Sequence, residues 1–120
     1  MATKRIPAIL RRTTPTLYFT FWQQKTPSPD GGEPNPLDLT GATVTLSAKK
    51  SPDSSESVLF ALSCNVDDAE KGSASVVLTT TATDRIGMVF CEVRAVFTSG
   101  PRAGEEHADY FQMPILEKLS

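Results

Sequence analysis

Apolar and polar residues alternate along several short runs of this chain, and this two-residue period limits the fold more than any other feature of the sequence. The longest run spans 88–97. The residues that would share one face of this strand are Val89, Cys91, Val93, Ala95 and Phe97. No long run shows the 3.6-residue period of an amphipathic helix. The sequence therefore predicts an all-β protein in which 88–97 is a central strand.

The same alternation predicts the other strands. They are expected at 17–22, 42–48, 57–63, 73–79 and about 106–115. Within them, alternate apolar residues such as Phe19, Phe21, Leu46 and Val58 are expected to face the core. The glycines and proline of 98–104 are typical of a turn, so the last two strands should form a hairpin.

Three connecting segments separate these strands. The Pro/Gly-rich segment 23–37 is predicted to be a long surface loop, either a contact element or a tether between strands. The polar segment 65–72 is predicted to be a second loop. The segment 80–87 is expected to hold at most one helical turn, with Thr81 or Thr83 as its cap and Ile86 tucked beneath it.

The length of 120 residues suits one compact domain. We expect a single domain, 1–120, that folds as an immunoglobulin-like antiparallel β-sandwich of about six to eight strands, with a small barrel as the alternative. The segment 1–12 is predicted to be an N-terminal arm, either solvated or docked on a neighbour. The apolar segment 114–120 is predicted to be a C-terminal tail.

Three segments carry a pattern beyond simple alternation. The first reads DLTGATVTL at 38–46 and continues as KKSPD at 49–53. The second is RRTTPTL at 11–17, and the third is LTTTATD at 78–84 followed by GMVFCEV at 87–93. Together they resemble the immunoglobulin-like N-terminal domain of phage upper baseplate proteins and related small tail proteins.

This resemblance implies a virion structural protein of the tail, baseplate or neck. Such a protein would be assembled in the cytoplasm of the bacterial host, as a homo-oligomer in contact with other phage structural proteins. A receptor- or glycan-binding module of a phage fibre, or a capsid decoration protein, is the alternative. The chain departs from the family pattern at Val89 and Cys91, where aromatic residues are usual, and at Glu92, where aspartate is usual. The resemblance implies no catalytic residue.

The charges and the apolar runs argue against two classes of partner. Twelve basic and 14 acidic residues give a formal net charge of −2, and the basic residues are scattered apart from a group near the start. A protein that binds nucleic acid generally needs a basic stripe, so no nucleic-acid partner is expected. No stretch approaches the roughly 20 apolar residues of a membrane-spanning helix, so no membrane partner is expected.

The residues that carry chemistry are few. One histidine, His107, and two cysteines do not make a metal site, and no serine lies in a Gly-x-Ser-x-Gly turn. We therefore expect no cofactor, no metal and no enzymatic activity. The acidic group of Asp67, Asp68 and Glu70 is predicted to be a solvated loop, with a calcium site as the minor alternative. Cys64 and Cys91 are expected to be reduced structural thiols, with a bridge between them as the alternative.

The remaining candidates are surface residues. Large aromatic side chains on the less buried face of a strand mark either a protein interface or a second covered face. Basic residues of the arm and apolar residues of the tail are further candidates for contacts with neighbours. The predicted interface residues are Lys4, Arg5, Ile6, Leu10, Arg11, Arg12, Trp22, Tyr110, Ile115 and Leu116.

Overall fold

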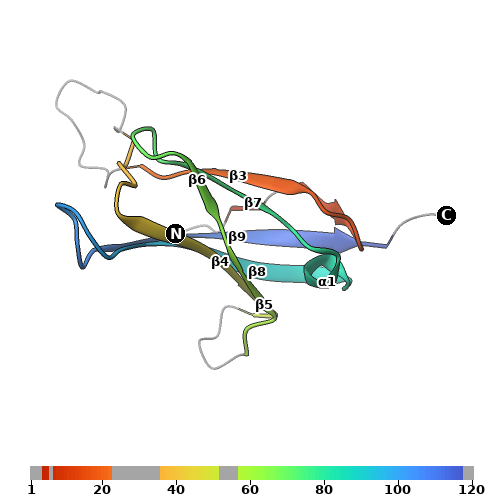
Figure 1. Ribbon diagram of the computed structural model, residues 1–120. Coiled ribbons are helices and arrows are strands. Elements are labelled where there is room, and N and C mark those ends of the chain that lie inside the picture. The colour runs from red at the N-terminus through yellow and green to blue at the C-terminus, as the bar shows by residue number, and fades with distance from the viewer. Residues whose placement is uncertain (1–3, 6, 23–35, 52–56, 118–120) are drawn as a thin grey trace, which may run out of the picture.

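The computed structural model describes residues 4–5, 7–22, 36–51 and 57–117, and these form two β-sheets that pack face to face (Figure 1). The elements are β1 (Lys4–Arg5), β2 (Ile9–Leu10), β3 (Thr16–Thr20), β4 (Ala42–Lys49), β5 (Phe60–Ser63), β6 (Asn65–Asp68), β7 (Ser73–Val77), α1 (Thr80–Thr83), β8 (Gly87–Phe97) and β9 (Glu106–Leu116). The predicted all-β sandwich is confirmed, and two dipeptide strands bring the number of strands in the described part to nine.

The larger sheet is built around β8. Its strand order is β1-β9-β8-β4-β5, and β2 also pairs with β9. β8 runs antiparallel to β9 on one side and to β4 on the other, so the predicted hairpin and the predicted central strand are both confirmed. The smaller sheet has the order β3-β7-β6 and lies over the larger one (Figure 1).

The core lies between the two sheets and follows the predicted alternation. All five predicted inward residues of β8 are buried, and so are the alternate residues Val44, Leu46 and Ala48 of β4. Phe19 of the small sheet contacts Phe111 of the large sheet, with ring centroids 5.7 Å apart. This aromatic contact joins the two layers.

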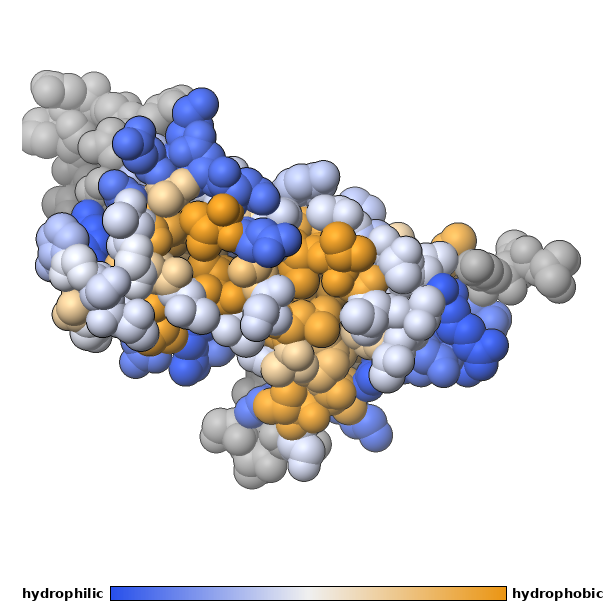
Figure 2. All heavy atoms as spheres, in the orientation of Figure 1, coloured by the Kyte–Doolittle hydropathy of each residue, from blue (hydrophilic) through white to orange (hydrophobic). Residues whose placement is uncertain are grey.

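One side of the sandwich exposes apolar surface. The chain leaves the large sheet at β5 and enters the small sheet at β6, and Figure 2 shows hydrophobic side chains gathered between the layers on this face. Phe60 and Leu62 are half-buried here. Val58 was predicted to be inward, but it precedes β5 and is exposed, because the strand begins only at Phe60.

Three local predictions in the middle of the chain are wrong. The predicted loop 65–72 contains β6, because pairing with β7 supplies the ladder that its polar sequence does not suggest. The single helical turn forms as α1, but its cap is Thr79, whose hydroxyl accepts the amide of Ala82 at 3.0 Å. Ile86 is exposed, because the chain turns from α1 directly into β8.

The described parts of both predicted terminal segments belong to the sandwich. β1 and β2 both pair in parallel with β9, so this part of the arm 1–12 is a docked edge of the large sheet. Ile9 is buried there. β9 continues to Leu116, and Ile115 is fully buried, so the predicted tail 114–120 begins inside a strand.

The long segment 23–37 lies mostly outside the described residues. Its last two residues are described, and Leu37 is fully buried in the core instead of lying at the surface. The amide of Leu37 donates to the carbonyl of Phe21 at 2.9 Å, so the two ends of this segment meet. The predicted surface loop therefore ends too late in the sequence, because residue 37 belongs to the core.

Candidate functional site

A groove of about 760 Å³ lies on the outer face of the large sheet, the face that points away from the small sheet. Alternation builds most of it, because the residues of β4 and β8 that lie between the core-facing ones face outward, while the buried residues Cys91 and Phe111 also border it. We call it the sheet groove. Its lining residues are Thr45, Ser47, Lys49, Ser51, Val58, Phe90, Cys91, Glu92, Arg94, Tyr110 and Phe111.

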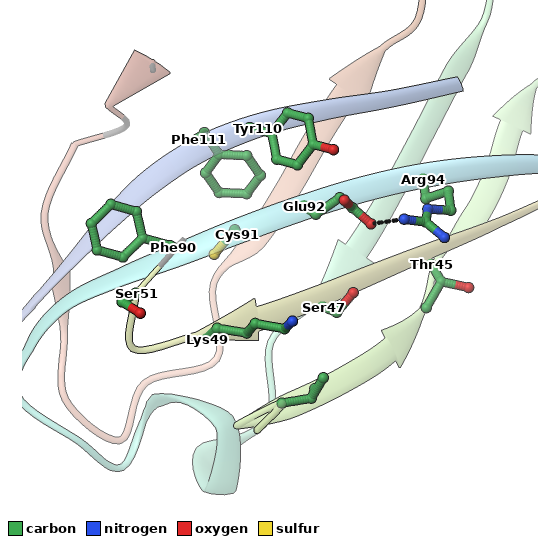
Figure 3. A pocket seen from close by; sticks show the side chains of 11 residues that line it. Thr45, Ser47, Lys49, Ser51, Phe90, Cys91, Glu92, Arg94, Tyr110 and Phe111 are labelled. Carbon is green, nitrogen blue, oxygen red and sulfur yellow. Dashed lines mark ion pairs between the residues drawn. The ribbon is translucent and has the colours of Figure 1, made fainter. Parts of the chain in front are cut away.

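The strand register arranges the lining of the groove in rows. Ser47, Glu92 and Tyr110 are direct neighbours across β4, β8 and β9. The next row places Thr45 beside Arg94. Figure 3 shows Glu92 and Arg94 between the aromatic rings of β8 and β9 and the polar side chains of β4. The groove thus combines aromatic, hydroxyl and charged groups from three strands.

The charges inside the groove are paired. The guanidinium of Arg94 lies 2.8 Å from the carboxylate of Glu92 and 3.5 Å from that of Glu106 (Figure 3 shows the first pair). Glu92 and Arg94 are two residues apart on one strand, so they lie on the same face. The pairing holds both side chains in place, and Lys49 of β4 adds a further basic group to the lining.

Tyr110 adds a third group to this network. The hydrogen bond from its hydroxyl to Glu92, together with the negative charge of that carboxylate, raises the pKa of Tyr110 above its ordinary value. Tyr110 is 56 % exposed, so much of this residue is open to solvent. Tyr110 therefore offers a flat, oriented surface at the side of the groove.

The two thiols are unpaired, as expected, and are poor nucleophiles. Cys91 is buried beneath the groove, and burial raises its pKa to about 12. Burial also raises the pKa of Cys64, which is half-buried, to about 11. Because the thiolate is the reactive form, neither residue is activated at neutral pH.

A second surface brings together several of the predicted interface residues. Leu10 and Leu116 are register partners on β2 and β9, and their exposed fractions are 46 % and 50 %. Next to them, Arg11 lies 2.9 Å from Asp84 and 2.8 Å from Glu117. We call this surface the terminal patch, and its members are Leu10, Arg11, Arg12, Asp84, Leu116 and Glu117.

The ion pairs of the terminal patch join segments that are far apart in the sequence. Arg12 lies 2.9 Å from Asp84 and has a left-handed backbone, with φ of 62°. Hydrogen bonds donated by Arg12 and Arg11 lower the pKa of Asp84, and those that Arg11 donates to Glu117 and Asp84 raise the pKa of Arg11. These two arginines, predicted as docking residues, thus bind carboxylates of their own chain.

The other predicted interface residues lie elsewhere. Trp22 is 51 % exposed and forms an isolated bridge with Pro36, away from both surfaces. Ile115 is fully buried, so its predicted place on a contact surface is wrong: its side chain faces the core from β9. The backbones of Lys4 and Arg5 pair with Phe111 and Gln112, while Ile6 lies outside the described residues.

The described residues do not assemble a metal centre. No group of three or more histidine, cysteine or carboxylate side chains that could hold a metal ion occurs among them. Asp68 instead forms an ion pair with Lys71 at 3.9 Å. His107 lies 3.0 Å from Glu105 and packs edge-on against Phe97. Within the same part of the chain, no helix is long and apolar enough to cross a membrane.

The predicted interface residues included Tyr110 but not Phe90, Glu92 or Arg94. The signal was present, because these three are among the outward residues of the longest alternating run. Alternation alone does not predict the strand register that places Glu92 beside Tyr110.

Comparison with known proteins identifies no family for this chain. No protein-family model matches this chain, and no curated protein matches its sequence.

Proposed function

We propose that this chain is a non-enzymatic structural protein of a bacteriophage particle, a component of the tail, baseplate or neck that works through contacts between subunits. It would assemble in the cytoplasm of the bacterial host and reside in the virion. Its partners would be identical subunits and other phage structural proteins, with neither nucleic acid nor membrane among them.

The observation that carries this proposal is the pairing of Leu10 with Leu116. Register places two large apolar side chains side by side at the surface, and each is about half exposed. Burying such side chains against a neighbour contributes about 25 cal/mol per Å² of apolar area. The ion pairs of Arg11 hold the adjoining backbone in place, so a neighbour would meet a rigid surface.

The segments 38–46 and 87–93, whose sequences resemble those of phage tail modules, form the turn before β4, the first part of β4 and most of β8. They build the centre of the large sheet. The proposed scaffold is therefore a rigid sandwich, and its specific contacts come from the terminal patch and from the exposed aromatic residue Trp22.

Self-association is tested by measuring molar mass by light scattering over a range of concentrations. The full chain is expected to form a discrete oligomer, and the double variant Leu10→Ser with Leu116→Ser to need at least about tenfold more protein to assemble. Val77→Ser, which changes another exposed apolar residue on the small sheet, is the matched control. A chain that is monomeric throughout, or a double variant that assembles like the wild type, would contradict the proposal.

Placement in the virion needs a separate measurement. Mass spectrometry of purified particles, from a phage that encodes this chain, should detect it at a stoichiometry that matches a symmetric ring or tail. Particles that assemble fully without the chain would rule out a structural role.

A further inference from the structure

The sheet groove has the composition of a small-ligand site. Its volume of about 760 Å³ falls within the range of roughly 300–1,000 Å³ that is common for such sites. It combines apolar and aromatic groups with a few polar groups whose positions are held by the strands. The terminal patch, by contrast, offers two exposed leucines.

The paired charges decide which ligands the groove favours. Arg94 forms ion pairs with the carboxylates of Glu92 and Glu106, and Glu92 also accepts a hydrogen bond from Tyr110. The lining also holds Lys49, but a charged ligand that bonds directly to Arg94 or to Glu92 must separate the pair that these two residues form. Separating such a pair leaves an unpaired charge, which is costly. A neutral ligand avoids that cost, because it can donate to the carboxylate and accept from the guanidinium without separating them.

The aromatic and hydroxyl groups of the lining further restrict the class of ligand that fits the groove. Tyr110 and Phe90 come from adjacent strands. Their aromatic rings can pack on the flat, C–H-lined face of a ligand ring, because the face of an aromatic ring is electron-rich. Thr45 and Ser47 line the groove with hydroxyls that both donate and accept. A ligand that matches both features is neutral, has apolar ring faces and carries many hydroxyls.

We infer that the sheet groove binds a neutral saccharide, with a sugar ring packed on Tyr110 and its hydroxyls bonded to Glu92, Arg94 and Ser47. This binding activity is separate from the proposed subunit contacts, because the groove and the terminal patch share no residue. Either role can therefore fail while the other stands.

The test is titration of the isotope-labelled full chain with neutral hexasaccharides, followed by amide NMR. Suitable probes are β-1,4-linked glucose, α-1,4-linked glucose and β-1,4-linked N-acetylglucosamine, with a galacturonic acid hexamer as the acidic counterpart. At least one neutral probe should shift the amides of β4, β8 and β9 around the groove. The acidic probe should bind more weakly, because its carboxylates can bond to Arg94 only by displacing Glu92 and Glu106 from that guanidinium.

Two tyrosine variants form a matched pair for this test. Tyr110→Ala should weaken binding about fivefold or more, whereas Tyr18→Ala, at an exposed tyrosine of the small sheet, should leave it unchanged. Tyr110→Phe keeps the ring but loses the bond to Glu92, so its effect should be smaller than that of Tyr110→Ala. Circular dichroism verifies that each variant is folded.

Three results would overturn the inference. They are the absence of binding by every neutral probe at about 10 mM, equal losses from Tyr110→Ala and Tyr18→Ala, and binding of the acidic probe as tight as that of the neutral ones. Glu92→Gln supplies a further check, since it removes the acidic partner of Arg94. That variant should lose affinity for the neutral probe and gain affinity for the acidic one.

Discussion

Glu92 accepts a hydrogen bond from the hydroxyl of Tyr110, its register partner on β9. This bond links two strands on the exposed face of the large sheet. It also ties Tyr110 to the ion pair between Glu92 and Arg94. One carboxylate therefore positions both an aromatic ring and a guanidinium.

The first prediction concerns the ionisation of Tyr110. Its pKa is raised because the phenolate would lose the hydrogen bond to Glu92 and would lie beside a negative charge. Glu92→Gln removes that charge, so the pKa of Tyr110 should fall toward its ordinary value of 10. Ultraviolet absorbance of the phenolate, measured against pH in a Tyr18→Phe background, isolates Tyr110. An unchanged titration curve would show that Glu92 does not influence Tyr110.

The second prediction concerns pH and the terminal patch. Arg12 and Arg11 lower the pKa of Asp84 from 3.8, so the folded state favours its carboxylate form. That contribution is fully present above the unfolded pKa and is lost as the pH falls through the lower folded value. Asp84→Asn should therefore lower Tm at pH 7, and the difference from the wild type should shrink below about pH 4. Asp67→Asn, at an exposed aspartate of β6, is the control and should change Tm little at either pH.

The third prediction concerns Gly72, which has a φ of 69° in the turn between β6 and β7. A Cβ at this position would lie 2.5 Å from the carbonyl oxygen of Phe21 and 2.7 Å from that of Leu37. Gly72→Ala should lower the free energy of unfolding by about 2 kcal/mol or more, through backbone strain and this clash. Gly104→Ala has a similar positive φ but open space around its Cβ, so it should cost less. Equal losses in urea unfolding would show that the clash is relieved.

The fourth prediction compares two neighbours on β2. Ile9 is 8 % exposed, and Leu10 is 46 % exposed. Ile9→Ala should lower the free energy of unfolding by about 2–4 kcal/mol, because it leaves a cavity beneath β9. Leu10→Ala should cost less than about 1 kcal/mol. Urea denaturation measures both values, and a small effect at Ile9 would mean that β2 does not hold the edge of the sheet.

Much of the sandwich could be predicted from the sequence, because alternate residues of a strand point to opposite faces of the sheet. The inward residues of β8 and β4 were predicted correctly, as was the hairpin between β8 and β9. The prediction failed where the local sequence does not show clear alternation. β6 has a polar sequence and becomes a strand only because β7 lies beside it, and Ile115 was assigned to a tail although β9 carries it into the core.

The sequence by itself determined the fold class and which side chains face the core, since local periodicity and turn residues encode both. Only the tertiary structure decided which residues meet on the outside of the sheet. The row of Ser47, Glu92 and Tyr110, and the pairing of Leu10 with Leu116, depend on strand register between distant segments. Register is set by the packing of the whole core, because a slip of one residue would turn every inward side chain to solvent.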